Sequence, residues 1–191
     1  MTTAKRPHYS YEQYLRLLAE TDLKLEYCDG IIYAMAGGTV AHAALGASAM
    51  YALRQALPAS CTVFSSDLKV RIETSDLSTF PDASVVCGLP QRSPIDKDAI
   101  TNPAILVEVT SASTEDYDRG DKLSHYKQIP GLRAVLFVSH RTPRVTVIAR
   151  TVDGWDERDL RPGEVVQLET PALRFSVDDL YGNVTLETDT R

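Results

Sequence analysis

A single carboxylate interrupts the most apolar strand-like segment of the sequence. Glu108 lies in the run 104–109, Ala-Ile-Leu-Val-Glu-Val, which is typical of a central strand covered on both faces. Burying a carboxylate there costs several kcal/mol unless it is paired, protonated or bound to a cation. In a purely structural role, Glu108 would be compensated by an arginine or by backbone donors. The alternative is that Glu108 belongs to a functional site.

Asp82 is the candidate neighbour of Glu108. It follows Pro81 directly before the β-rich run 83–87, and neighbouring strands lie about 4.8 Å apart. Two carboxylates that close raise each other's pKa unless a divalent cation lies between them, and such hard oxygen ligands favour Mg²⁺ or Mn²⁺. Taken alone, Asp82 is typical of a solvated loop edge. Together with Glu108 it predicts a metal site.

Lys122 would supply the cation that a hydrolytic metal site needs to hold the attacked phosphate and to steady the nucleophilic water. It lies in a predicted helix after the Glu108 strand, with Asp118, His125 and Tyr126 on the same helix face. The alternative is a solvated helix lysine paired with Asp118.

Weaker candidates for phosphate contact lie elsewhere. Lys69 and Arg71 share a strand face with Asp67, and they would meet backbone phosphates or simply face solvent. The run 37–39, Gly-Gly-Thr, at a helix start offers free backbone N–H groups to an anion, with His42 in the first turn. Helix punctuation is the alternative meaning of that run.

A mixed set of helices and strands must position these residues. Helical spacing predicts a short amphipathic helix over 11–20 behind Ser10 and an alanine-rich helix that ends at Leu57 before Pro58. Asp29-Gly30 between two strand-like runs predicts a hairpin, which places Glu26 near a tight turn. The strand-like segments of this half are 23–27, 31–35, 62–64, 68–72 and 83–87.

The sequence pattern of the second half of the chain predicts a helix, two strands and an acidic extension. Ser113 or Thr114 marks the helix start, and the helix runs to about Gln128. The strands span 134–138 and 144–149, and the hairpin extension spans about 151–191 with a turn capped by Ser176. Without repeats or linkers, the chain predicts one α/β domain over 1–191, with a mixed central sheet and an N-terminal helix and hairpin at about 10–36.

The distribution of charge bears on the class of partner. The chain has 191 residues, 43% of them hydrophobic, and a net charge of −6, which argues against tight, indiscriminate binding to nucleic acid. Residues 115–150 nevertheless hold 7 basic and 4 acidic side chains, whereas residues 151–191 hold 4 and 10. A local, metal-bridged contact with phosphate is compatible with this distribution.

Composition also bears on the compartment. No stretch approaches the roughly 18 apolar residues of a membrane span, and residues 1–7 lack an apolar export core. We therefore expect a cytoplasmic protein. Cys28, Cys61 and Cys87 form no CxxC pair, and each lies in or beside an apolar run. We expect buried, reduced thiols and no metal at these cysteines.

The order of motifs from about Tyr11 to Tyr181 resembles the Uma-type restriction endonucleases, a bacterial family within the PD-(D/E)xK nuclease superfamily. The resemblance covers nearly the whole chain. It is carried by Glu26-Tyr27-x-Asp29-Gly30, Met35-Ala36-Gly37-Gly38 with His42, Ser65-Ser66-Asp67-Leu68-Lys69-Val70, Pro81-Asp82, Val107-Glu108-Val109 with Ser111 and Ser113-Thr114, and Tyr117-Asp118-Arg119-Gly120-Asp121-Lys122.

This resemblance implies a restriction-endonuclease-like core of helix, three strands, helix and strand, and metal-dependent cleavage of DNA phosphodiesters. Asp82 matches the Asp of the "PD" signature and Glu108 the acidic residue of the "(D/E)xK" element. Thr110 stands where that element has its lysine. A lysine displaced onto the following helix matches Lys122, and Glu26 resembles an added acidic ligand.

The leading hypothesis is a Mg²⁺- or Mn²⁺-dependent endonuclease that acts on double-stranded DNA. Asp82 and Glu108 would bind the metal, Glu26 would be a further ligand or a base that orients water, and Lys122 would stabilise the attacked phosphate. Contacts with nucleic acid would come from Lys69, Arg71, His42 and Arg119.

Two other classes of protein stay open. One is a noncatalytic nucleic-acid-binding or regulatory module on the same fold, which the missing strand lysine and the acidic composition favour. The other is a structural α/β oligomer with an ion-paired Glu108. For the nuclease we also expect a homodimer, because duplex cleavage usually needs two sites, and the alanine-rich helix or the C-terminal hairpin would supply a two-fold contact.

Overall fold

The main sheet carries the candidate site. The computed structural model describes residues 7–35, 37–110 and 115–186, and within these ranges the sheet has six strands. They are β3 (Cys61–Ser65), β6 (Ala83–Cys87), β8 (Ile105–Thr110), β9 (Ala134–Ser139), β10 (Val145–Arg150) and β11 (Trp155–Leu160). Their order is β11-β10-β9-β8-β6-β3, with β8 parallel to β9 and all other neighbours antiparallel.

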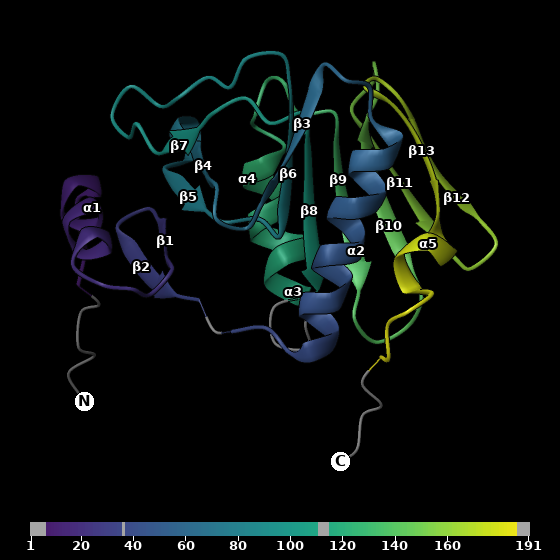
Figure 1. Cartoon of the computed structure of the whole chain (residues 1–191). Helices are drawn as coiled ribbons and strands as arrows, with labels where there is room; N and C mark the ends of the chain where they lie inside the picture. The colour runs from purple at the N-terminus through teal and green to yellow at the C-terminus, as the bar shows by residue number, and fades with distance from the viewer. Residues whose placement is uncertain (1–6, 36, 111–114, 187–191) are drawn as a thin grey trace.

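One face of this sheet is covered by α2 (Val40–Ala56), whose N-cap Thr39 accepts a hydrogen bond from the His42 backbone N–H at 3.2 Å. Leu45 and Leu53 of α2 are completely buried against the sheet. Helix α5 (Val177–Tyr181) and the hairpin of β12 (Val165–Glu169) and β13 (Ala172–Ser176) complete the covering of this face (Figure 1).

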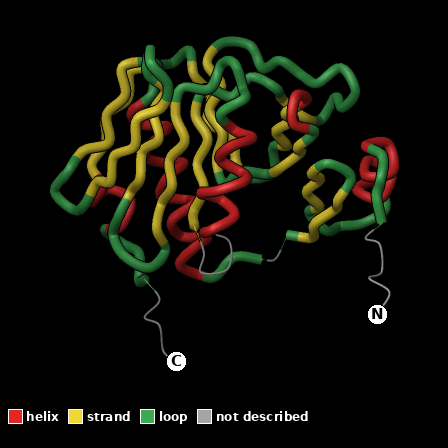
Figure 2. The backbone as a smooth tube through the Cα atoms, turned by 180° about the vertical axis from the view of Figure 1, so that it is seen from behind, coloured by secondary structure: helices red, strands yellow, loops and turns green. Residues whose placement is uncertain are grey.

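The other face is covered by a short helical segment and a second sheet. The helical segment consists of α3 (Glu115–Tyr117), the π-helical turn η2 (Asp118–Lys122) and α4 (Leu123–Tyr126). Within the described ranges the second sheet has the order β2-β1-β5-β4-β7. Its elements are β1 (Leu25–Cys28), β2 (Ile31–Ala34), β4 (Lys69–Ile72), β5 (Leu77–Thr79) and β7 (Ala99–Ile100), with α1 (Tyr11–Ala19) beside it and the 3₁₀ turn η1 (Glu73–Ser75) between β4 and β5 (Figure 2).

Local signals that the sequence carries are confirmed in several elements. Ser10 caps α1 through a capping box with Gln13. Asp29 and Gly30 take positive φ values of 42° and 79° in the turn between β1 and β2, as a tight hairpin requires. Strand β8 is buried at every position, and the mixed α/β fold is the predicted one.

Other expectations need correction. The segment 68–72 forms β4, but β4 belongs to the second sheet and not to the sheet of β3 and β6. Strands β5 and β7, with three and two residues, are too short to show an alternating pattern. The predicted helix to Gln128 is divided by η2 and ends earlier, at Tyr126. Its predicted start at Ser113 or Thr114 lies outside the described residues.

The expectation of reduced thiols is wrong for two cysteines. Cys61 and Cys87 face each other in the antiparallel register of β3 and β6 and form a disulfide. Cys28 is free and half-buried. The pairing depends on strand register, which separate apolar runs do not reveal. Among the described helices, we find none with the length and apolarity that a membrane crossing needs.

Replacing Leu45 by alanine should lower the free energy of unfolding by about 3 kcal/mol, because it leaves a cavity between α2 and the main sheet. Tyr51→Ala on the exposed face of the same helix is the control, since Tyr51 keeps 67% of its surface exposed and should change stability little. Urea denaturation measures both variants. Equal losses would contradict this account of the core.

Candidate active site

Asp82 and Glu108 come from neighbouring strands at one end of the main sheet. Ala83 pairs with Val107 across β6 and β8, so the same register sets Asp82 opposite Glu108 on one sheet face. Asp82 Oδ2 accepts the backbone N–H of Val109 at 2.7 Å. The structure therefore brings the two predicted carboxylates together.

Lys122 reaches these carboxylates from the π-helical turn. Its Nζ lies 3.0 Å from Glu108 Oε1, 3.5 Å from Glu26 Oε1 and 3.7 Å from Asp118 Oδ1, and only 4% of the side chain is exposed. In a π-turn, residues four apart lie closer to one face than in an α-helix, and such turns are frequent at functional sites. The alternative of a solvated lysine paired with Asp118 is wrong in its first part only, because Lys122 is buried but does pair with Asp118.

Glu26 enters the site from the second sheet. Its Oε1 accepts hydrogen bonds from the Thr79 hydroxyl and from the Phe80 backbone N–H, the latter at 3.2 Å. Because the same oxygen also faces Lys122, these contacts favour a role in positioning the lysine. The role of Glu26 as a metal ligand stays a prediction.

The electrostatics of Glu108 and Lys122 follow from burial and crowding. Burial raises the pKa of Glu108 to about 8; Lys122 opposes this rise, whereas Asp82 and Asp118 add to it. Burial alone would lower the pKa of Lys122, but the negative field, led by Glu108, outweighs it and raises that pKa well above its ordinary value. Lys122 is therefore a permanent cation in an acidic cluster.

Tyr126 is the residue whose role the sequence pattern did not reveal. Its hydroxyl donates to Glu108 Oε1, and burial, followed by the charge of Glu108, raises its pKa well above the ordinary value. The tyrosine thus stays protonated and orients the carboxylate. Its position four residues after Lys122 was the available signal, but helical spacing alone does not distinguish such a tyrosine from a core residue.

His42 approaches from the first turn of α2, with its Nε2 3.4 Å from Asp82 Oδ2. The hydrogen bond with Asp82 raises the pKa of His42, although burial opposes this effect. The side chains of Asp82 and His42 are 18% and 24% exposed, whereas those of Glu108 and Lys122 are 7% and 4% exposed. Solvent therefore reaches the site from the side of Asp82 and His42.

Three other predicted contact residues are engaged inside the protein. Lys69 is buried with its Nζ 2.6 Å from Asp96, and buried Arg71 forms an ion pair with Asp76. These two side chains are buried and do not face solvent. They are therefore not placed to meet a phosphate at the protein surface. Arg119 is a quarter exposed and pairs with Glu115 at 3.1 Å.

Surface cavities do not coincide with this cluster. A pocket of about 630 Å³ lies where η1 approaches the chain around Asn102 and Arg133, and a second of about 590 Å³ lies beside α1. Neither is lined by Glu26, Asp82, Glu108 or Lys122. In the described part of the chain, no three His, Cys, Asp or Glu side chains form a ready-made metal site. The carboxylates instead face the lysine.

Most of the sequence matches a known family. The family model Uma2, described as "Putative restriction endonuclease", matches residues 11–179. The chain belongs to the Uma2 family.

Relatives from a cyanobacterium support the assignment to Uma2. An uncharacterised protein of Synechocystis sp., slr1290, is 34% identical over 181 residues, which are 94% of each chain. A second one, sll1609, is 28% identical over 138 residues, covering 70% of this chain and 76% of the relative.

A solved structure shows the same fold. The crystal structure of a putative nuclease of the family DUF820 from Anabaena variabilis superposes with a TM-score of 0.72, covering 90% of this chain and 96% of the other, at 19% identity. The Uma2 chain therefore shares its architecture with that protein.

Glu108 should make stability depend on pH. Between its ordinary pKa of 4.5 and the raised pKa of about 8, the folded state holds a proton that the unfolded state has lost, so stability from this group falls as pH rises through that window. As the pH rises through this window, we expect the free energy of unfolding of the wild type to fall relative to that of Glu108→Gln. Denaturation at several pH values measures this, with exposed Glu12→Gln as control. A constant difference would contradict the assignment.

Proposed function

We propose that this chain is a Mg²⁺- or Mn²⁺-dependent endonuclease that hydrolyses phosphodiester bonds of double-stranded DNA. The observation that carries the proposal is the convergence of Asp82, directly before β6, with Glu108 of β8 and Lys122 of η2, whose Nζ lies 3.0 Å from Glu108. It is the combination of two carboxylates and one cation that hydrolysis of a phosphate ester needs. Membership of the Uma2 family supports the same reaction class.

The donor set of the site fits such an ion. Asp82 and Glu108 offer hard carboxylate oxygens on one sheet face, and Mg²⁺ is commonly held by one or two carboxylates and several waters. Burial, with Asp82 and Asp118 adding to its effect, raises the pKa of Glu108, and a divalent cation beside this carboxyl group would favour its ionised form. The chemistry that the ion supplies when bound is activation of water and neutralisation of phosphate charge.

The chain's own residues do the positioning. Lys122 stays protonated in the acidic cluster and would pair with the attacked phosphate. Glu26 holds Lys122 from the second sheet, at 3.5 Å, and Tyr126 orients Glu108 through its hydroxyl. His42 and the first turn of α2 lie on the exposed side, where a phosphate would approach.

One observation favours the noncatalytic alternative. Lys122 already pairs with Glu108 and Glu26, so part of the negative charge of the site is compensated without a metal. A chain that binds DNA through this fold without cleaving it would keep the same contacts. The experiments below therefore separate binding from cleavage.

Asp82→Asn should abolish nicking of supercoiled plasmid in Mg²⁺, with a loss of about 100-fold or more, because a metal ligand and its charge disappear together. Asp98→Asn is the matched control, since Asp98 is exposed and lies away from the site. Gel assays of plasmid relaxation measure both variants. Nicking by Asp82→Asn at the wild-type rate would overturn the assignment.

Chelation provides an independent test of the metal. We expect EDTA to stop nicking and Mg²⁺ or Mn²⁺ to restore it, because the carboxylates alone do not activate water. Salt-dependent DNA binding that persists in EDTA, together with no cleavage in either metal, would instead establish the noncatalytic module. Calorimetry that detects no divalent-metal binding would favour the third alternative, a structural α/β oligomer in which Glu108 is only ion-paired.

The proposal includes self-association, because a homodimer would place one site against each strand of a DNA duplex. Tyr51 is 67% exposed on the outer face of α2, as is Val40 at 87%, which leaves this helix available for a two-fold contact. Light scattering at micromolar concentration would distinguish a dimer from a 21.1 kDa chain.

A further inference from the structure

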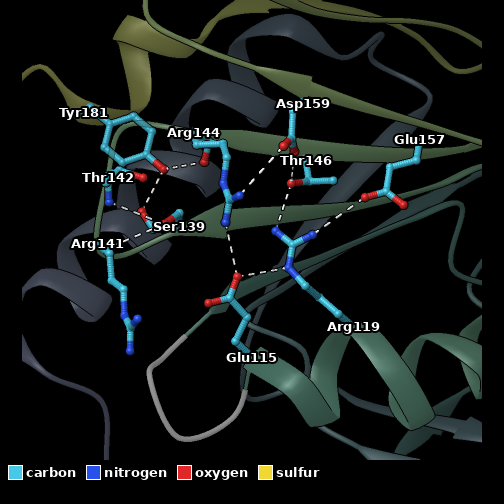
Figure 3. A network of polar contacts seen from close by, with 10 residues as sticks. All are labelled: Glu115, Arg119, Ser139, Arg141, Thr142, Arg144, Thr146, Glu157, Asp159 and Tyr181. Atoms are coloured by element: carbon cyan, nitrogen blue, oxygen red, sulfur yellow. Dashed lines mark hydrogen bonds and ion pairs between the residues drawn. The ribbon is translucent and has the colours of Figure 1, made fainter.

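A closed ring of polar contacts ties the start of the helical segment to the far strands of the main sheet (Figure 3). Glu115 accepts from Arg119 at 3.1 Å and from Arg144 at 3.2 Å. Arg119 also donates to the Thr146 hydroxyl at 2.8 Å, and that hydroxyl donates to Asp159. Arg144 closes the ring, 3.7 Å from Asp159.

The ring is anchored on several elements. The Arg119 guanidinium lies 5.1 Å from the centre of the Phe137 ring on β9. The Tyr181 hydroxyl of α5 donates to the backbone carbonyls of Ser139 and Arg144, at 2.8 and 2.7 Å, so the chain that carries Arg144 is fixed at both ends of the β9–β10 turn. The ring therefore has little freedom to move.

The segment that begins at this ring needs such an anchor. The segment is continuous over residues 115–126, with the π-turn in its middle, and helices shorter than about 12–15 residues are only marginally stable without tertiary contacts. Arg119 precedes Lys122 by three residues in the same π-turn. A displacement of the turn would therefore move Lys122 away from Glu108.

We propose that Arg119 and Arg144 are positioning residues, which hold the π-turn so that Lys122 and Tyr126 meet Glu108. The catalytic consequence of this role rests on the proposed function. In this role the Arg119 guanidinium contacts other groups of the protein, Glu115 and Thr146, in place of the expected contact with nucleic acid.

Lysine labelling tests the proposal without reference to activity. Arg144→Gln opens the ring, and an amine-acylating reagent followed by peptide mass spectrometry should show Lys122 labelled about tenfold faster, because a charge-assisted network has been lost. Lys69, equally buried at 4% and paired with Asp96, should stay protected. Exposed Lys97 reports full reactivity. Arg144→Lys should restore part of the protection, since one amine reaches one carboxylate.

The matched control is Arg141→Gln, three residues before Arg144, whose side chain extends away from the ring (Figure 3). It should leave labelling of Lys122 unchanged. Protection of Lys122 in Arg144→Gln at the wild-type level would overturn the proposal. If Lys69 is also labelled in Arg144→Gln, that variant has unfolded, and Thr146→Val then replaces it as the test of the proposal. It keeps the shape of the side chain and removes only the hydroxyl link, so unchanged protection of Lys122 in it overturns the proposal.

Kinetics separates positioning from DNA contact. For the plasmid-nicking reaction, we expect Arg144→Gln to lower kcat about tenfold with KM unchanged, because the chemistry and not the binding is disturbed. A raised KM with unchanged kcat would assign the arginines to DNA and overturn the proposal. If the wild type does not cleave DNA, the proposed function fails, and the labelling experiment alone decides whether the ring positions Lys122.

Discussion

The buried pair of Lys122 and Glu108 is the constraint on which the surrounding structure depends. The Lys122 ammonium, and the Glu108 carboxylate whenever it is ionised, each lose several kcal/mol of hydration on burial, so both groups need close partners. Glu108 has the lysine at 3.0 Å and the hydroxyl of Tyr126. Lys122 has Glu26 and Asp118 in addition. Elements far apart in sequence must therefore meet at one point, and any shift of one of them leaves a charge without compensation.

The path of the chain between β5 and β6 brings the two sheets, and the charged residues that they carry, to the same point. Strand β5 ends at Thr79, which donates to Glu26, and Asp82 follows three residues later, opposite Glu108. This crossing links the sheet that carries Glu26 to the sheet that carries Glu108. Buried apolar residues on either side of the crossing, such as Leu77 and Val85, help to fix the register of both sheets, because a slip by one residue would move each side chain to the opposite face of its sheet.

Local patterns predicted the carboxylates but not their full setting. The apolar run of β8 with its single carboxylate and the Pro-Asp before β6 are visible in the sequence, and so Asp82 and Glu108 were correctly brought together. The reach of Lys122 depends on a π-turn, which has no clear sequence signal. Lys69 of the second sheet pairs with Asp96, which lies 27 residues later in the sequence. Such contacts depend on tertiary register, and short-range spacing does not contain it.

The charge of the site also explains how an acidic chain would meet a polyanion. Glu26, Glu108 and Asp118 pair with Lys122, and Asp82 pairs with His42. Acidic side chains therefore outnumber basic ones at the site, and their field opposes the approach of a phosphate. In the proposed function a divalent cation reverses that local charge, which makes DNA binding at this site depend on the metal. The overall charge of −6 then limits nonspecific binding without excluding the specific contact. Metal and substrate are therefore expected to bind to this cluster as thermodynamically linked ligands, each raising the affinity for the other.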